Sequence, residues 1–229
     1  MGNKQEQKVL VVDDEEAILE LLKYNLEKQG YIVKTATDAI KGVEIATKFI
    51  PDVILLDIMM PKQDGVETCR QLRGIPEIAK AFIIFLTARS EEYSEVAAFD
   101  AGADDYITKP IKPRALMSRI NAYFRRDVQK NEASDQIVID DLTIDRTSYT
   151  VNLKGKEIIL PKKEFELLHF LALNPNKVYG REELLQNIWG SDVYVLARTV
   201  DVHIRKVREK IGDAYITTVK GVGYKFALN

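Results

Sequence analysis

Four short apolar runs in the first half of the chain each end in a polar side chain that could do chemistry. In chain order, the residues that follow these runs are Asp13 and Asp14, Asp57, Thr87 and Lys109. Continuous apolar runs are typical of parallel strands buried on both faces, and open parallel sheets place their ligand crevices at the C-terminal strand ends. A single Asp after a strand is also consistent with the start of a loop. Convergence of all four ends would instead bring three carboxylates, a hydroxyl and an ammonium together.

The chemistry of this set indicates a divalent cation and a phosphoryl group. Three like charges repel, and each raises the pKa of its neighbours. Mg²⁺ relieves that repulsion, because it prefers oxygen ligands and suits a site with one or two carboxylates and several waters. Carboxylates are also known phosphoryl acceptors, and the Lys109 ammonium would stabilise the charge that arrives. We therefore expect Asp57 to be held ionised beside a metal.

The elements that must position these residues alternate along the first half of the chain. Strands are expected near residues 8–12, 31–35, 53–57, 82–86 and 105–107, and helices near 15–29, 38–49, 65–73, 91–101 and 113–124. Five strands that alternate with five helices predict an α/β fold with a doubly wound parallel sheet. The polar stretch 125–136 has no apolar period and is interpreted as a linker.

Composition limits the classes of protein that fit. The 229 residues are 46% apolar, with a net charge of −2, enough for two small packed domains. Residues 1–136 carry about −4 and residues 137–229 about +2, by counting charged side chains. Cys69 is the only cysteine, which excludes a disulfide framework and suggests a small packed residue. No apolar run is long enough for a membrane span and no signal region is apparent, so a cytoplasmic protein without membrane contact is expected.

The second half combines short strands with three helices, of which the third, near 198–211, is the most informative. Val200, Ile204, Val207 and Ile211 form an apolar stripe about 60° wide at 100° per residue. Arg198, Arg205, Lys206 and Arg208 lie away from that stripe, with Val202 among them. A basic face opposite an apolar stripe suits a recognition helix in the major groove of double-stranded DNA, although an ordinary solvated helix would fit this pattern equally well.

Several motifs resemble the receiver domain of two-component response regulators, in that family's order and spacing. They are Val11-Val12-Asp13-Asp14-Glu15, Leu56-Asp57-Ile58-Met59-Met60-Pro61, Leu86-Thr87-Ala88 and the stretch from Ala101 to Pro110. The resemblance implies a flavodoxin-like sheet of order 2-1-3-4-5 in a receiver domain at 1–125. It also implies that Asp57 accepts phosphate from a sensor histidine kinase.

The remaining receiver roles are likewise implied by the resemblance. Asp14 and, mainly through water, Asp13 bind Mg²⁺ together with Asp57 and the Met59 carbonyl oxygen. Lys109 pairs with the phosphoryl group, Thr87 moves toward it, and Tyr106 turns inward as an aromatic switch, unless Tyr106 is an ordinary edge-strand aromatic. The Lys109-Pro110 bond resembles the cis peptide of the family. Met59 and Arg89 occupy positions that tune hydrolysis, and because Met59 bonds water poorly we expect a long-lived phosphoryl-Asp57.

The second half resembles the winged helix-turn-helix effector of the OmpR/PhoB subfamily. This resemblance rests on the stretches Arg198–Arg208 and Thr218–Tyr224, and it covers nearly all of residues 137–229, after a linker at 126–136. The implied DNA-binding residues are Arg198, Thr199, His203, Arg205, Lys206, Arg208, Thr218, Lys220 and Tyr224. Of these, Thr218 and Tyr224 are implied to support the wing as well as to contact phosphate. His203 could equally be a packed helix residue. Relatives contact RNA polymerase through the loop at Trp189–Ala197, which is short here.

Phosphorylation is expected to favour a homodimer whose effector domains bind direct-repeat half-sites about one helical turn apart. By resemblance, the receiver face that pairs carries the ion-pairing residues Asp100, Asp104, Asp105 and Arg119. Glu95 and Ala115 replace a Lys and a Glu that relatives use on that face. The loss of one surface pair costs at most about 1 kcal/mol, so dimerisation is still expected.

Three alternatives use parts of the same pattern. An Asp-nucleophile phosphohydrolase would need the same groups, but such enzymes usually carry a second acid where Met59 stands, so we expect no enzyme. A flavodoxin-like FMN binder would suffer repulsion between its phosphate and the Asp13-Asp14 loop. A phosphorylation-independent, constitutively dimeric regulator would not need the full set of Asp57, Thr87 and Lys109.

Overall fold

The computed structural model describes residues 7–228 except 62, 89–98, 129–135 and 191–196, and only the backbone of 122 and 125–128. The chain forms two compact units, residues 1–131 and 132–229, which are described separately. Within the described residues, no helix is long and apolar enough to cross a membrane.

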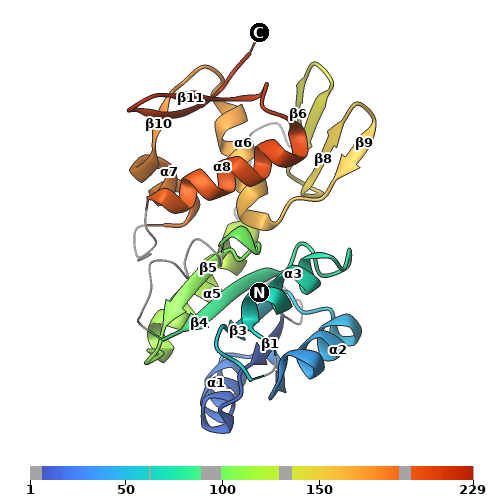
Figure 1. Cartoon of the computed structure of the whole chain (residues 1–229), viewed down its shortest axis with the longest axis vertical. Coiled ribbons are helices and arrows are strands. Elements are labelled where there is room, and N and C mark those ends of the chain that lie inside the picture. The colour runs from blue at the N-terminus through green and yellow to red at the C-terminus, as the bar shows by residue number, and fades with distance from the viewer. Residues whose placement is uncertain (1–6, 62, 89–98, 129–135, 191–196, 229) are drawn as a thin grey trace. The chain divides into compact units, whose positions relative to one another are not determined.

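The first unit is built on a five-stranded sheet whose neighbouring strands are all parallel (Figure 1). Its strands are β1 Lys8–Val12, β2 Ile32–Ala36, β3 Val53–Asp57, β4 Phe82–Thr87 and β5 Asp105–Thr108. The order β2-β1-β3-β4-β5 confirms the predicted topology. All five residues of β3 are buried, which is why its sequence is an unbroken apolar run up to Asp57.

Helices join the strands and pack on the sheet (Figure 1). They are α1 Glu16–Lys28, α2 Ala39–Phe49, α3 Gly65–Arg73 and α5 Pro113–Val128. Asp38 and Asp64 cap α2 and α3 by accepting hydrogen bonds from the backbone N–H groups of Lys41 and Glu67. Leucines of α1 and α5 join sheet residues in one apolar cluster, in which Leu22, Leu26, Leu116 and Ile120 are fully buried.

Two details differ from the sequence-based expectation. The α5 helix continues to Val128, into the stretch interpreted as linker, because nothing there breaks a helix: the stretch 114–128 contains neither Gly nor Pro. The helix expected at 91–101 lies mostly outside the described residues, of which Phe99 and Asp100 are helical.

Among its described residues, the second unit contains two antiparallel sheets and three helices (Figure 1). One sheet has the order β6-β7-β8-β9, with strands at Gln136–Ile139, Leu142–Asp145, Thr150–Leu153 and Lys156–Ile158. The other has the order β10-β12-β11, with strands at Tyr179–Gly180, Gly223–Phe226 and Ile216–Val219. The sequence did not predict β6 or β10, which are short and carry little pattern of their own.

The three helices of this unit are α6 Lys162–Leu173, α7 Arg181–Ile188 and α8 Arg198–Ile211. The predicted stripe of α8, Val200, Ile204, Val207 and Ile211, is buried and faces α6 and α7. Val202, expected on the basic face, is also buried, so the apolar stripe of α8 is wider than predicted. The helix therefore keeps only part of its circumference for solvent or a ligand.

Candidate functional site

Three carboxylates meet at the C-terminal edge of the first sheet. Asp13 and Asp14 follow β1, and Asp57 is the last residue of β3, the neighbouring strand. One carboxylate oxygen from each lies within 4.8 Å of the others. Asp13 and Asp57 are buried, whereas Asp14 is exposed. The strand ends therefore converge as predicted.

The Lys109 ammonium lies among these acids. Its Nζ is 2.9 Å from Asp13 Oδ2, 3.2 Å from Asp57 Oδ1 and 3.3 Å from Glu15 Oε1. Glu15 was not singled out as a site residue in the sequence, although it stands two residues after Asp13. The backbone N–H of Glu15 also donates to Asp13 Oδ1 at 3.0 Å, which fixes that turn.

Burial and charge act in opposite directions on the acids. Burial raises the pKa of Asp57, the Lys109 ammonium opposes that rise and the Asp13 carboxylate adds to it, so the pKa stays above its usual value. Burial lowers the pKa of Lys109, but its bonds to Asp13 and Asp57 outweigh that effect and the pKa is raised. Three acids around one ammonium leave an excess of negative charge, so a divalent cation with oxygen ligands fits this set.

The loop after β3 approaches the site closely because residue 65 is glycine. A Cβ atom at Gly65 would lie 2.1 Å from the carbonyl oxygen of Asp57. The backbone N–H of Gly65 donates to the Ile58 carbonyl at 2.9 Å. The start of α3 is thereby packed directly on the backbone that carries Asp57.

The other predicted receiver residues lie on the chain after β3 and on strands β4 and β5. Thr87 ends β4, half-buried, and its hydroxyl donates to the Ala88 carbonyl at 3.1 Å. The side chain of Met59 is 74% exposed. Tyr106 is buried, with its ring edge-on to Phe99 at a centroid distance of 6.0 Å, so it already points inward. The Lys109-Pro110 bond is cis, as expected, and Arg89 lies outside the described residues.

The structure corrects the interpretation of Asp104. This residue was expected to be an acidic member of an ion pair between two receivers, but its side chain is fully buried. Its Oδ2 lies 2.6 Å from the Arg73 guanidinium and accepts the backbone N–H of Ile83 at 2.9 Å. Arg73 also donates to the Gly102 carbonyl, which joins α3 to the start of β5. The short side chain of Asp104, just before β5, therefore accepts a backbone hydrogen bond inside the fold instead of reaching the surface.

Asp105 and Arg119 pair with each other within one chain. The Arg119 Nη1 lies 2.7 and 2.6 Å from the two carboxylate oxygens of Asp105. Both side chains are largely buried, with exposed fractions of 5% for Asp105 and 15% for Arg119. Asp100 is half-buried, Ala115 is exposed, and Glu95 lies outside the described residues. Asp105 and Arg119, which were expected to pair with a second receiver, therefore pair with each other within this chain.

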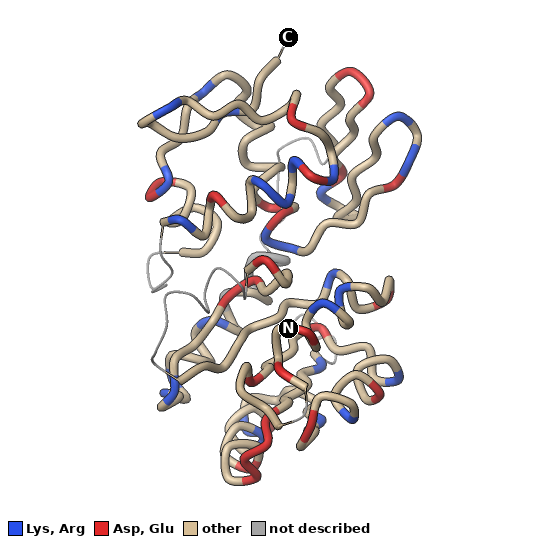
Figure 2. The backbone as a smooth tube through the Cα atoms, viewed as in Figure 1, with Lys and Arg blue, Asp and Glu red and all other residues tan. Residues whose placement is uncertain are grey.

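Several Lys and Arg positions lie along the backbone of α8 in the second unit, interspersed with acidic ones (Figure 2). Arg198 and Arg205 are exposed and Lys206 is half-buried. Arg205 and Lys206 share one acid, with Glu209 carboxylate oxygens 3.4 Å from Arg205 and 3.7 Å from Lys206. This face of the helix is basic, as predicted, but carries its own counter-charge.

Two residues assigned to DNA by resemblance are packed instead. His203 is 4% exposed, its Nδ1 lies 2.9 Å from the Thr199 carbonyl oxygen, and its ring meets Trp189 edge-on at 4.9 Å. Thr199 is also buried. The broader apolar stripe of α8 explains both corrections, and His203 is the packed helix residue of the alternative interpretation.

The hairpin β11–β12, called the wing below, is fastened to α8. Arg208 donates to the Ile216 carbonyl at 2.7 Å and to the Thr218 hydroxyl at 2.9 Å. Its guanidinium is therefore engaged by the wing, whereas the resemblance implied that it contacts DNA. Lys220 and Thr218 are exposed. Tyr224 is buried, and its hydroxyl donates to Asp201 Oδ1 at 2.6 Å, an arrangement that fits the expected support of the wing and leaves the hydroxyl engaged inside the fold rather than with phosphate. Burial and this bond raise the pKa of Tyr224.

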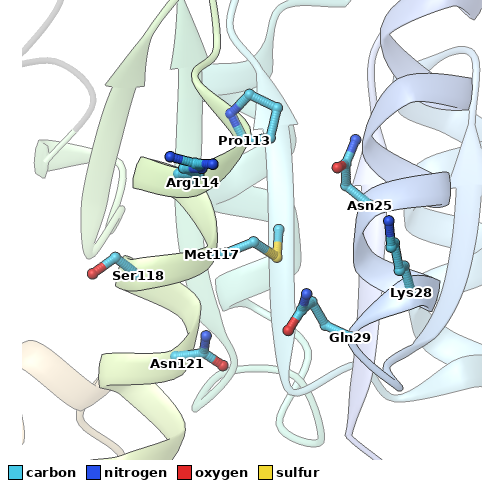
Figure 3. Close-up of a pocket in the computed structure, with 8 residues that line it drawn as sticks. All are labelled: Asn25, Lys28, Gln29, Pro113, Arg114, Met117, Ser118 and Asn121. Carbon is cyan, nitrogen blue, oxygen red and sulfur yellow. The ribbon is translucent and has the colours of Figure 1, made fainter.

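A surface pocket of about 540 Å³ lies between α1 and α5 of the first unit (Figure 3). Asn25, Lys28 and Gln29 approach it from α1, and Met117 points into it from α5. Its remaining lining residues are Pro113, Arg114, Ser118 and Asn121. None of them belongs to the carboxylate cluster.

Comparison with known proteins assigns a family to each unit. The family described as "Response regulator receiver domain" matches residues 9–121, and the family described as "Transcriptional regulatory protein, C terminal" matches residues 155–226. The response regulator DrrB of Thermotoga maritima, described as an OmpR/PhoB homolog, is 38% identical, with 97% of this chain and 100% of that one covered and a TM-score of 0.49.

Two further solved structures are similar. A substituted form of RitR is 27% identical over 97% of this chain and 100% of its own, with a TM-score of 0.76. A CheY-like receiver domain protein of Methanospirillum hungatei is 30% identical over 53% of this chain and 96% of its own, with a TM-score of 0.51. Because both family descriptions match in this order, the chain belongs to the two-component response regulators with an OmpR/PhoB-type effector and is a phosphorylation-dependent transcriptional regulator that binds DNA.

Proposed function

We propose that Asp57 is the phosphoacceptor of this regulator and that the donor is a phosphohistidine of a sensor kinase. The observation that carries this proposal is the placement of Asp57 at the end of β3, 3.2 Å from the Lys109 ammonium. In the transfer, a carboxylate oxygen of Asp57 attacks phosphorus, the P–N bond to the donor breaks, and the leaving imidazole nitrogen keeps the electron pair.

Asp13, Asp14 and Asp57 would hold Mg²⁺, with the Met59 carbonyl as a further oxygen ligand. The three carboxylates support this, since each offers an oxygen within 4.8 Å of the others. When bound, the ion supplies positive charge that offsets the phosphoryl oxygens. Lys109 would exchange a contact with Asp13 or Glu15 for one with a phosphoryl oxygen, and the Thr87 hydroxyl would turn from the Ala88 carbonyl toward the same group.

We propose that these bonds shift the receiver toward a state that dimerises. Such a shift requires that phosphoryl-Asp57 bonds better to Thr87 and Lys109 in one backbone arrangement than in another. Tyr106, the second residue of β5, would be the aromatic switch, and its buried position supports a state in which the ring is inward. Arg119, Asp105 and Asp100 remain candidates for the pairing face, whereas Asp104 is removed from it.

The proposed DNA contacts are revised by burial. Arg198, Arg205 and Lys206 on α8 would reach bases or phosphates, while Thr218 and Lys220 on the wing would contact the backbone or the minor groove. Two effector units, joined through linkers near residues 126–136, would occupy direct-repeat half-sites about one helical turn apart in the cytoplasm. A contact with RNA polymerase through 189–197 falls largely on residues outside those described.

The test is a light-scattering measurement of mass in Mg²⁺, before and after a small phosphodonor is added. The wild type is expected to shift from monomer to dimer and Asp57→Asn to stay monomeric. An unchanged mass in both proteins would favour the constitutive regulator. Phosphoryl-Asp57 is also expected to persist, and decay within seconds in Mg²⁺ would contradict the role given to Met59. Sustained hydrolysis of a small phosphate ester would instead indicate an enzyme.

A further inference from the structure

A cluster of polar side chains joins three elements of the DNA-binding unit. Arg181 is the first residue of α7, Asp201 and Arg208 lie on α8, and Tyr224 lies on β12 of the wing. Neither Arg181 nor Asp201 has an assigned role in the function proposed above. The cluster lies where the recognition helix and the wing meet.

One carboxylate oxygen organises this cluster. Asp201 Oδ1 lies 2.6 Å from Arg181 Nε and accepts the Tyr224 hydroxyl, also at 2.6 Å. The Arg181 Nη2 lies 3.4 Å from that hydroxyl. The three groups form a closed triangle of charge-assisted hydrogen bonds, which are stronger than neutral ones. The bond to Asp201 raises the pKa of Arg181, so the guanidinium stays charged.

Two guanidinium groups also lie over the Tyr224 ring. The central carbon of Arg181 lies 5.2 Å from the ring centroid and that of Arg208 lies 5.8 Å from it. Both distances fall in the range of a cation–π interaction. Arg208 in turn donates to Ile216 and Thr218 on the other wing strand. Each strand of the wing is therefore tied to α8 by a different side chain.

The wing needs such ties because it has little stability of its own. A two-stranded hairpin is marginal in water, and β11 and β12 each have four residues. Packing on α6 and on β10 supports the base of the wing, and on β10 the backbone packs so closely that a Cβ at Gly223 would lie 2.0 Å from the Tyr179 carbonyl oxygen. That contact holds the base of the wing, whereas the exposed Lys220 lies beyond it at the tip.

We infer that Arg181 and Asp201 are positioning residues that fix the wing against the recognition helix, so that Lys220 and α8 engage one DNA duplex together. The inference rests on the proposed DNA contacts of Lys220 and α8. Binding two surfaces at once is favourable only when their separation is set beforehand, since otherwise the ordering cost opposes binding. Arg181 then acts through Asp201 and Tyr224 rather than by touching DNA.

A double-mutant cycle on the full-length protein tests the inference. The probe is a duplex selected by the wild-type protein from a random library, and the readouts are Kd and its dependence on salt for wild type, Arg181→Met, Lys220→Met and the double variant. In the wild-type background, Lys220→Met should weaken binding about threefold to tenfold and reduce the salt slope by about 0.9. In the Arg181→Met background, the same change should alter Kd less than twofold and leave the slope unchanged.

Matched variants separate positioning from direct contact and from unfolding. Arg198→Met, at the exposed start of α8, should combine additively with Lys220→Met. Arg181→Lys, which keeps the charge but loses the planar fork, should restore part of the coupling, and Asp201→Asn should behave like Arg181→Met. If Arg181→Met lowers the folded fraction measured by circular dichroism, Asp201→Asn and Arg181→Lys replace it in the double-mutant cycle with Lys220→Met.

The outcomes are distinct. Additive effects of Arg181→Met and Lys220→Met, each with its own loss of salt slope, would overturn the inference and make Arg181 a DNA contact. An absence of coupling between Asp201→Asn and Lys220→Met would overturn it as well. Failure of the wild-type protein to select any duplex would instead contradict the DNA contacts proposed above.

Discussion

Replacing Lys109 by Met tests whether charge balance holds the carboxylate cluster together. Its Nζ lies 2.9 Å from Asp13 and 3.2 Å from Asp57, and at an effective dielectric constant of ~20 each contact is worth roughly 5 kcal/mol of attraction. The acids themselves repel by at least about 3.5 kcal/mol for each pair at the same dielectric constant, because their oxygens lie within 4.8 Å of one another. Solvent screens the exposed Asp14, and the buried acids can take up a proton. We therefore expect a net loss of about 3–5 kcal/mol, the usual cost of an orphaned buried charge.

The assay is urea unfolding of the full chain, followed by far-ultraviolet circular dichroism in EDTA at pH 7.5. Trp189, the only tryptophan, lies in the second unit, so its fluorescence transition should not change. Adding Mg²⁺ should recover at least half of the loss, because the ion replaces the missing positive charge. Lys112→Met, an exposed change of the same chemistry three residues away, should shift stability by less than about 0.5 kcal/mol.

The pH dependence gives a second readout of the same variant. An acid whose folded pKa is raised, as for Asp57, keeps its proton in the folded state after the unfolded chain has lost it near pH 4. Stability is then highest at low pH and falls as pH rises through the folded pKa. Lys109→Met should raise the pKa of Asp57 further. The loss of stability of this variant relative to wild type should therefore become smaller as the pH is lowered from 7.5 to 5. A loss that is the same at both pH values and insensitive to Mg²⁺ would refute the charge argument.

Three more predictions follow from single contacts. Gly65→Ala should destabilise the first unit by about 1–3 kcal/mol or more in urea unfolding, because the new Cβ would lie 2.1 Å from a carbonyl oxygen of β3. Glu209→Gln should tighten non-specific DNA binding about twofold to fivefold at low salt, because it removes a carboxylate that lies 3.4 Å from Arg205 and 3.7 Å from Lys206; fluorescence anisotropy that shows no change would contradict this. Burial and a nearby guanidinium lower the pKa of His169 to about 4. The stability of the second unit should therefore fall as the pH drops from about 6.5 toward 4, with a slope of at most about 1.4 kcal/mol per pH unit. His169→Gln should remove that slope.

The receiver sheet and the carboxylate cluster were predictable because their signals are local. A buried parallel strand must be apolar along its length, so the acid after it can only stand at its end, as Asp57 does. The buried stripe of α8 was likewise predictable from a short stretch, whereas the cis peptide was expected only from the resemblance to the receiver family. In each case the sequence pattern and the physical constraint involve the same few residues.

The errors concern side chains whose partners are distant in the chain. Asp104 bonds to Arg73, 31 residues away, and Tyr224 reaches Asp201 across 23 residues. An acid or a tyrosine in a surface-like pattern gives no sign that such a partner exists. His203 was ambiguous for another reason, because it borders the stripe of α8 and only the position of Trp189 decides which side it takes.

The internal pair of Asp105 and Arg119 limits what phosphorylation can gain from electrostatics on the receiver face. Exchanging this pair for the same pair across a twofold axis replaces one contact of 2.6 Å with a chemically identical one, so the enthalpy gained is close to zero. Such an exchange would contribute to specificity, because only a partner that carries the same acid and base at the same positions completes both ion pairs without leaving a charge unpaired. Because relatives of this subfamily carry the same acid and base, the pair would fix the geometry in which two such receivers meet rather than the strength of their dimer.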